Sequence, residues 1–172
     1  DPDINAWAQF ERNAVTIDEF DRLFYGEAKA KGCSVPGKDV IALLSGNLRP
    51  AMVTALTRVS ERLKTGCITN NVESGKGAGM ARSHEAANAV ADVMKLFQIV
   101  LESSKVGVRK PSPEIYQMAC DKLEIDPSDA VYLDDLGVNL KPARAMGMTT
   151  IKVVDPDQAI KDLQDLVGFP LG

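Results

Sequence analysis

The chain has 172 residues, and its 20 lysines and arginines against 24 aspartates and glutamates give a formal net charge of −4. Hydrophobic residues make up 45% and charged residues 26%, which is typical of a globular domain. The mild acidity argues against a nucleic-acid-binding protein, which normally has a basic face. No apolar run approaches the roughly 20 residues of a membrane span, and the first residues lack the pattern of a signal peptide. These features predict a cytoplasmic protein with one core and room for a small lid.

Cysteine and histidine are scarce in this sequence. Cys33, Cys67 and Cys120 are an odd number without C-x-x-C spacing, which disfavours a disulfide framework or a zinc site. We therefore expect three reduced thiols, most of them buried. The single histidine, His84, has no cysteine or second histidine nearby, and we expect it at the surface. The side-chain groups left to form a functional site are therefore carboxylates, lysine, hydroxyls and amides.

The pattern of the chain changes near residue 50. Before it, apolar residues recur at helical spacing, and Thr16 followed by Glu19 is a capping box that predicts a helix over residues 17–30. After it, amphipathic helices alternate with short apolar runs, which predicts a parallel sheet covered on both faces. The predicted strands are 67–69, 97–101, 130–133 and 149–154.

Polar side chains follow three of these strands. They are Thr69 and Asn70 after the first, Lys110 after the second, and Asp134, Asp135 and Asn139 after the third. Ligands of such sheets bind at the carboxyl ends of the strands. Two adjacent carboxylates repel each other unless a cation is near, and an all-oxygen site suits Mg²⁺ together with a phosphate. A lysine and a hydroxyl beside that ion would bind phosphoryl oxygens. The sequence thus predicts a magnesium-dependent phosphoryl-transfer site acting on a small phosphorylated substrate.

Three segments, residues 67–71, 102–116 and 131–144, resemble motifs of the haloacid dehalogenase (HAD) superfamily. The strings Lys-Pro-x-Pro-x-Ile-Tyr and Leu-Asp-Asp-x-Gly-x-Asn-Leu are the most specific parts of this resemblance. Within the superfamily, the chain is most similar to the phosphatase domain of soluble epoxide hydrolases and to related acyl-CoA dehydrogenase fusion domains. The resemblance implies an α/β fold: a three-layer, Rossmann-like parallel sheet with a small helical cap.

The resemblance also implies roles for the site residues. Thr69 would hydrogen-bond the transferring phosphoryl group, and Asn70 would line the same pocket. Lys110 would balance the charge of the nucleophile and the phosphate. Asp135 would bind Mg²⁺ directly, whereas Asp134 would either ligate the ion or orient its waters.

The same resemblance predicts two regions. Residues 1–48 would form part of the helical cap, which selects the substrate and excludes water. Residues 49–172 would form the Rossmann-like core, in which Asn139 would support the loop that carries the acidic pair.

The nucleophile of the family is missing from its expected place. Family members begin with a strand ending in Asp-x-Asp, whose first aspartate attacks phosphorus and whose second acts as general acid and base. Asp1 and Asp3 have this spacing, but no strand is predicted before them, so we interpret the pair as coincidence. By the resemblance, the missing strand is the central one, and its loss would leave two half-sheets with unpaired inner edges. We expect about 10–20 further native residues before Asp1, and no activity from the chain as given.

Two other functions stay open at this point. A 2-haloacid dehalogenase uses the same aspartate attack on carbon without a metal, and the adjacent acids Asp134 and Asp135 argue against it. A non-catalytic interaction domain would retain the HAD fold and lack the reaction. Magnesium binding separates the phosphatase, which needs the ion, from the dehalogenase, which does not.

Overall fold

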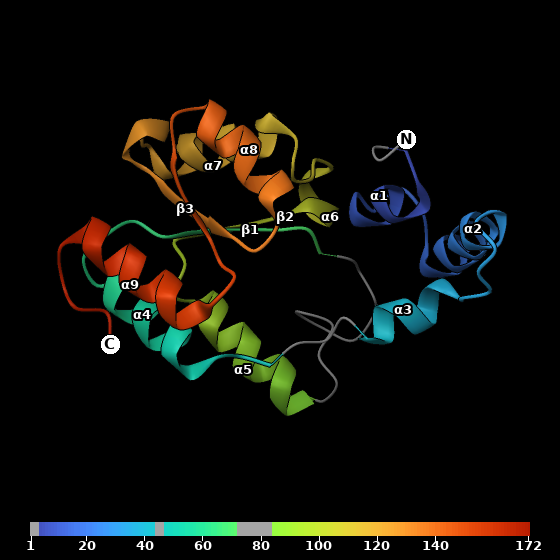
Figure 1. Ribbon diagram of the computed structural model, residues 1–172, viewed down its shortest axis with the longest axis horizontal. Coiled ribbons are helices and arrows are strands. Elements are labelled where there is room, and N and C mark those ends of the chain that lie inside the picture. Colours follow the sequence, from blue (N-terminus) through green and yellow to red (C-terminus); the bar gives the residue numbers. More distant parts are fainter. Residues whose placement is uncertain (1–3, 44–46, 72–83) are drawn as a thin grey trace. The chain divides into compact units, whose positions relative to one another are not determined.

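The computed structural model describes residues 4–43, 47–71 and 84–172, except for the side chains of Ala42 and of residues 84–87 (Figure 1). The Asp1-x-Asp3 pair and the side chain of His84 therefore lie outside the described residues. The chain forms two compact units. One comprises Asp1–Asn47, Thr69–Asp92 and Glu102–Arg109, and the other comprises Leu48–Ile68, Val93–Leu101 and Lys110–Gly172.

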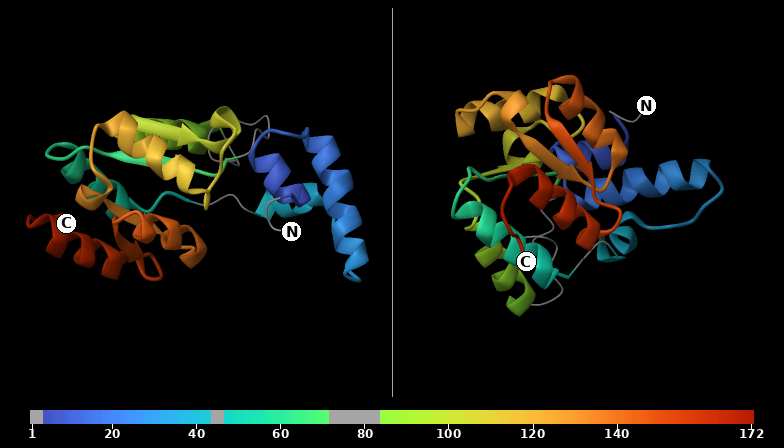
Figure 2. Two further views of the ribbon diagram at one scale, coloured as in Figure 1. Left: turned by 90° about the horizontal axis from the view of Figure 1, so that it is seen from above. Right: turned by 60° about the vertical axis from the view of Figure 1, so that its left-hand side comes forward.

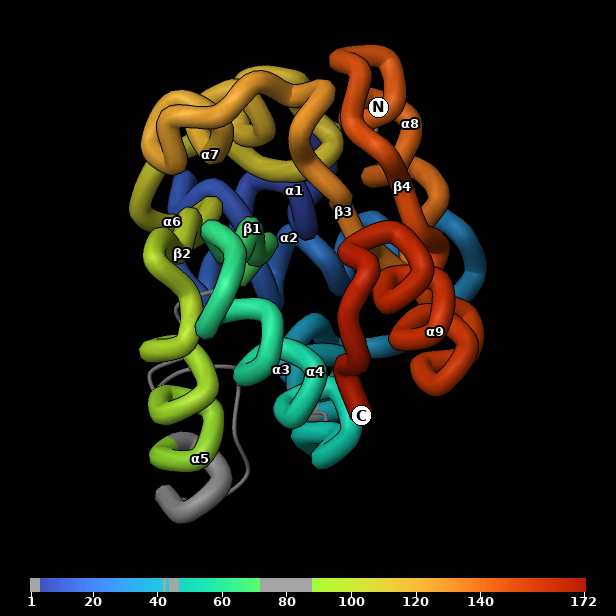
Figure 3. The backbone as a smooth tube through the Cα atoms, turned by 90° about the vertical axis from the view of Figure 1, so that its left-hand side faces the viewer, coloured from blue at the N-terminus to red at the C-terminus, as the bar shows by residue number. Residues whose placement is uncertain are grey.

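All four strands expected from the sequence are present. They are β1 (Gly66–Thr69), β2 (Ile99–Glu102), β3 (Val131–Asp134) and β4 (Thr149–Lys152). Within the described residues they pair as two separate two-stranded sheets, β1 with β2 and β3 with β4. Strands β3 and β4 lie side by side (Figure 3). They run parallel, with Val131 opposite Thr149 and Asp134 opposite Lys152. Among the described residues the strands thus form two half-sheets, as expected from the sequence.

Helices cover the strands and complete an α/β, Rossmann-like fold, as predicted. They are α4 (Pro50–Ser60), α5 (His84–Met94), α7 (Pro113–Leu123), the short 3₁₀ helix η2 (Pro127–Asp129), α8 (Gly137–Ala145) and α9 (Pro156–Val167). Helix α8 packs on β3 and β4, and α9 packs on β4 and beside α4 (Figure 2). No helix of the described residues has both the length and the apolar character needed to cross a bilayer.

An aromatic cluster holds three helices of the first unit together, namely α1 (Ala6–Glu11), α2 (Ile17–Ala30) and α3 (Gly37–Leu43). The short helix α6 (Ser103–Val106) contacts α1. Phe20 of α2 is fully buried, and its ring stacks on Phe10 with the centroids 4.4 Å apart. Trp7 meets Phe20 edge-on at 5.4 Å. Such pairs contribute about 0.5–1.5 kcal/mol each beyond the burial of their area, so this cluster is the core of α1–α3.

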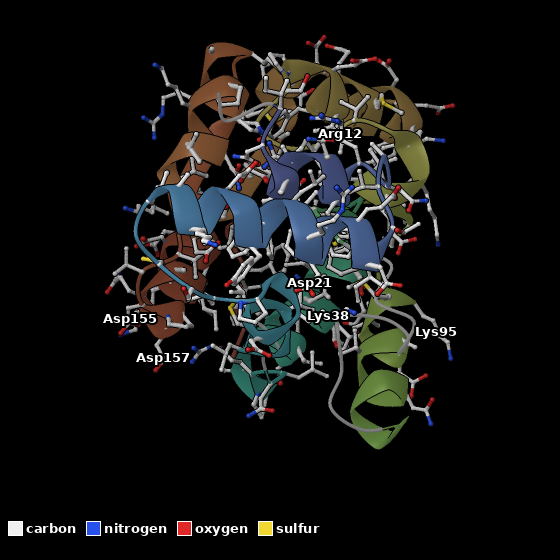
Figure 4. All side chains as sticks on the ribbon, turned by 90° about the vertical axis from the view of Figure 1, so that its right-hand side faces the viewer. Arg12, Asp21, Lys38, Lys95, Asp155 and Asp157 are labelled. Carbon is white, nitrogen blue, oxygen red and sulfur yellow. The ribbon has the colours of Figure 1, made fainter. Side chains whose placement is uncertain are left out.

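Polar contacts fix the ends of these helices. The predicted capping box is confirmed, because the Thr16 side chain accepts from the backbone N–H of Glu19 and the Glu19 side chain accepts from that of Thr16. At the start of α3, the backbone N–H of Lys38 donates to Oδ1 of Asp21 at 3.0 Å (Figure 4). Each of these hydrogen bonds gives an acceptor to a backbone N–H that has no partner within the first turn of its helix.

Gly37 lies where α3 approaches α2, and a larger residue there is expected to destabilise the first unit. A Cβ at Gly37 would lie 2.7 Å from Cε1 of Phe20 and 3.1 Å from Cβ of Phe24. Because Phe20 is buried and cannot move freely, Gly37→Ala should lower the free energy of unfolding by about 1–3 kcal/mol in urea denaturation.

Gly26 of α2 is the matched control for this substitution. A Cβ there would meet nothing within 4 Å, so Gly26→Ala should raise helix stability by about 0.5–1 kcal/mol. Equal effects of the two substitutions would contradict the close approach at Gly37.

The three cysteines are reduced thiols, as predicted, but they differ in burial. Cys120 is buried, Cys67 is half-buried and Cys33 is exposed, so the expectation of mostly buried thiols is wrong for Cys33. Burial raises the pKa of the Cys120 thiol, with further contributions from the charges of Asp121 and Asp126. Since the thiolate is the reactive form, Cys120 should be inert in the folded protein.

We expect iodoacetamide at neutral pH to label Cys33 well before Cys120. The extent of labelling at each cysteine is measured by peptide mass spectrometry. The exposure of Cys33 and the raised pKa of the buried Cys120 thiol both favour this order. The urea-unfolded chain is the control, in which both should react at similar rates. Equally fast labelling in the folded protein would show that Cys120 is not shielded.

Candidate functional site

The carboxylate of Asp134, at the end of β3, is the centre of the polar network in the second unit. Its Oδ1 accepts from the backbone N–H of Leu136 and from Nδ2 of Asn139, both at 2.9 Å. Its Oδ2 accepts from Nζ of Lys110 and from the hydroxyl of Tyr132, both at 2.8 Å. An ionised carboxylate offers about four acceptor positions. Protein donors therefore supply a full set of partners to Asp134.

These donors keep Asp134 ionised although it is buried. The side chains of Lys110 and Asp134 are only 13% and 5% exposed. Burial by itself would raise the pKa of Asp134, but hydrogen bonds from Lys110, Asn139 and the Leu136 N–H outweigh it, so the pKa is lowered overall. Hydrogen bonds to the charged form of a group favour that form. The result is a buried, charge-assisted pair between Asp134 and Lys110.

Two tyrosines, the buried Tyr116 and the half-buried Tyr132, border this network. The rings of Tyr116 (α7) and Tyr132 (β3) meet edge-on, with centroids 5.2 Å apart and planes at 87°. The Tyr116 hydroxyl donates to the backbone carbonyl of Asn139 at 2.8 Å. Burial raises the pKa of both phenols, and the hydrogen bond to Asp134 raises that of Tyr132 further. Both hydroxyls consequently remain protonated donors at neutral pH.

Tyr132 is a site residue that the sequence analysis missed. Alternate residues of a strand lie on the same face, so Tyr132 and Asp134 of β3 share a face of the sheet. A tyrosine two residues before a strand-end acid was the available signal, but it is too common to point to a site by itself.

Asp135 differs from the adjacent Asp134 in its exposure to solvent, which matters for binding a metal ion. It is exposed, whereas Asp134 is buried and fully hydrogen-bonded. The described residues contain no group of three or more histidines, cysteines and acids able to hold a metal ion. Mg²⁺, however, is usually bound through one or two carboxylates, waters and substrate phosphate. Asp135 fits such a role as a direct ligand, and the four donors to Asp134 favour the orienting role for that residue.

Thr69 and Asn70 lie in the other compact unit, so their surroundings are described separately. Asn71, which follows them, donates from Nδ2 to Oε1 of Glu102 at 2.9 Å and accepts at Oδ1 from the Ser104 hydroxyl at 2.9 Å. Its side chain thereby fixes the backbone just beyond Thr69 and Asn70 to the end of β2. The structure thus brings Lys110, Asp134 and Asn139 into one hydrogen-bond network. It holds the backbone beside Thr69 and Asn70 through the contacts of Asn71.

The segment before Lys110 is also held in place. In the first unit, Nε of Arg109 donates to Oε2 of Glu11 at 2.6 Å, and the two side chains are 17% and 9% exposed. This ion pair joins helix α1 to the residue directly before Lys110. Breaking one partner of a buried pair leaves an uncompensated charge, so such pairs restrain the chain strongly.

Comparison with known proteins identifies the family. The family haloacid dehalogenase-like hydrolase matches residues 6–147, and the chain belongs to it. Acyl-CoA dehydrogenase family member 10 of Mus musculus is 35% identical, over 98% of this chain and 16% of the mouse protein. Bifunctional epoxide hydrolase 2 of Sus scrofa is 35% identical, over 71% of this chain and 21% of the pig protein. Sesquiterpene phosphatase astK of Aspergillus oryzae is 25% identical, over 94% and 79%. The chain spans about a fifth or less of the first two relatives.

Solved structures share the fold. A HAD family enzyme of Bacteroides thetaiotaomicron, in complex with magnesium and inorganic phosphate, has a TM-score of 0.61 at 20% identity, over 87% of this chain and 75% of that chain. The L-2-haloacid dehalogenase of Xanthobacter autotrophicus has a TM-score of 0.57 at 15% identity, over 97% and 66%. At such identities the likeness establishes the α/β fold alone, and the reaction has to be argued from the site.

Removing Lys110 should destabilise the second unit strongly. Lys110→Met keeps most of the stem but leaves the buried Asp134 carboxylate without its counter-charge. Loss of one partner of a buried ion pair costs about 3–5 kcal/mol. We expect a decrease of this size in the free energy of unfolding of Lys110→Met, measured in urea at neutral pH.

Two further variants control this measurement. The double variant Lys110→Met/Asp134→Asn should regain part of the loss, since no charge is then buried. Lys141→Met on the exposed face of α8 should change stability by less than about 0.5 kcal/mol. A Lys110→Met variant as stable as Lys141→Met would show that the ion pair does not form.

Proposed function

We propose that this chain belongs to a magnesium-dependent phosphomonoester phosphatase that works through an aspartyl-phosphate. The observation that carries the proposal is the Lys110 ammonium held by the buried, ionised Asp134, directly beside the exposed Asp135. A fixed cation next to an exposed carboxylate suits a dianionic phosphate bound together with a divalent cation. The family assignment as a hydrolase supports the same reaction class.

The residues of the chain take distinct roles in this proposal. Lys110 neutralises charge on the phosphoryl group and on the attacking carboxylate, and Asp134 holds the lysine in place. Thr69 hydrogen-bonds a phosphoryl oxygen, and Asn70 lines the same pocket. Preorganised donors of this kind stabilise charge that develops in the transition state.

Asp135 is proposed as the Mg²⁺ ligand, with Asp134 and Asn139 orienting the loop that carries it. When bound, Mg²⁺ supplies electrostatic stabilisation of the phosphoryl oxygens. The magnesium and phosphate in the Bacteroides enzyme, and the name of the Aspergillus sesquiterpene phosphatase, support this assignment by similarity. A small phosphorylated molecule is accordingly the proposed substrate.

We further propose that the nucleophilic aspartate comes from a strand outside this sequence. In the described residues, β1 and β3 each pair with one strand and keep one open edge. Val131 and Leu133 of β3 are only half-buried, whereas strands of parallel α/β sheets are normally covered on both faces. An added strand would pair these edges and end at the carboxyl side of the sheet, where ligands bind.

A phosphatase assay of the protein with its native preceding residues tests the proposal. With p-nitrophenyl phosphate, turnover should require Mg²⁺, and the 172-residue chain alone should show none. Asp135→Asn should lower kcat by about a hundredfold. Asp165→Asn, an exposed acid in the last turn of α9, is the control and should leave kcat unchanged.

The outcomes separate the alternatives. Metal-independent release of halide from 2-haloacids, without phosphatase activity, would indicate a dehalogenase. Inactivity of the longer protein toward both substrate classes would favour a non-catalytic HAD-fold domain. Unchanged phosphatase activity in Asp135→Asn would exclude Asp135 as the metal ligand.

A further inference from the structure

Oδ2 of Asp134 accepts two hydrogen bonds from very different donors. Lys110 reaches it from the segment before α7, and Tyr132 reaches it from within β3, both at 2.8 Å. Lysine carries its charge on a flexible four-carbon stem. A tyrosine ring has few rotatable bonds, and here the Tyr132 ring packs edge-on against the buried Tyr116. The rigid donor and the flexible donor therefore meet at a single oxygen atom.

We propose that Tyr132 is a positioning residue, whose hydroxyl fixes the orientation of the Asp134 carboxylate and through it the position of the Lys110 ammonium. The contribution to catalysis rests on the function proposed above, whereas the positioning itself does not. Tyr132 touches neither substrate nor metal in this proposal. It acts through Asp134, in the same way that groups behind metal ligands and catalytic residues orient them.

The remaining donors cannot replace Tyr132 on this oxygen. The Leu136 N–H and the Asn139 amide both donate to Oδ1. Of the four donors to this carboxylate, only Lys110 would be left on Oδ2 without Tyr132. Oδ1 would keep its two donors, but Oδ2 would lose its rigid partner, and the Lys110 ammonium on its flexible stem could shift. Small displacements of a catalytic group reduce the rate strongly, since the reacting geometry is narrow.

A double-mutant cycle tests the positioning without any activity assay. Tyr132→Phe removes the hydroxyl and keeps the ring, so the variant should fold. Adding Lys110→Met leaves the buried Oδ2 without either donor. The double variant should therefore lose more stability than the sum of the losses in the two single variants. We expect the Tm of the double variant to lie about 2–4 °C below the additive value.

Tyr116→Phe is the matched control in this cycle. It also removes a buried tyrosine hydroxyl, but that hydroxyl donates to the backbone carbonyl of Asn139 and not to Asp134. Its effect on Tm should add to that of Lys110→Met. The proposal would be overturned if the Tm effects of Tyr132→Phe and Lys110→Met were also additive. It would equally be overturned if both tyrosine variants departed from additivity by the same amount.

The catalytic consequence is measured on the longer protein with p-nitrophenyl phosphate and Mg²⁺. Tyr132→Phe should lower kcat about tenfold with KM little changed, because a displaced Lys110 affects the transition state more than ground-state binding. Thr65→Val is the control: its hydroxyl donates to the Leu96 carbonyl at 2.9 Å, outside the network, and kcat should not change.

The two proposals fail in distinguishable ways. A wild-type protein that hydrolyses no phosphomonoester refutes the proposed function, and the Tm cycle alone then decides whether Tyr132 positions Lys110. An active wild type whose kcat is unaffected by Tyr132→Phe refutes the positioning role and leaves the phosphatase function intact. A tenfold loss together with the non-additive cycle supports both.

Discussion

The buried carboxylate of Asp134 is the interaction on which the candidate site depends. Four donors from β3, the following turn, α8 and the segment before α7 converge on its two oxygens. A carboxylate without partners at this depth would be costly, whereas a fully bonded one ties the contributing segments together. Lys110 and the loop bearing Asp135 are therefore fixed by the same group.

The adjacent acids Asp134 and Asp135 illustrate how position divides function between identical side chains. Asp134 is the last residue of β3 and lies in the interior, where protein donors take its acceptor positions. Asp135 leaves the strand and is exposed to solvent. The first side chain is suited to hold a cation of the protein, and the second to meet a cation from solution.

Membership of the HAD-like hydrolases explains the element order and the strand-end residues, but the fold alone does not select the reaction. Structures of a phosphate-bound HAD enzyme and of a haloacid dehalogenase match this chain to a similar degree. The choice between these chemistries rests on individual side chains, above all on the adjacent acids Asp134 and Asp135. Within the first unit, the Arg109–Glu11 pair adds a restraint to the residue beside that lysine.

The sequence by itself determined the elements and most of the candidate residues. The capping box at Thr16 and the strand that ends at Asp134 follow from local patterns, because caps, turns and apolar spacing act over a few residues. The division of the sheet was expected from the family resemblance. Only the tertiary structure decided that Cys33 is exposed, that Tyr132 joins the site, and that the two acids have different surroundings. Lys110 and Asp134 are 24 residues apart in the chain. Which donor reaches which oxygen depends on how distant segments pack, and no local pattern encodes that.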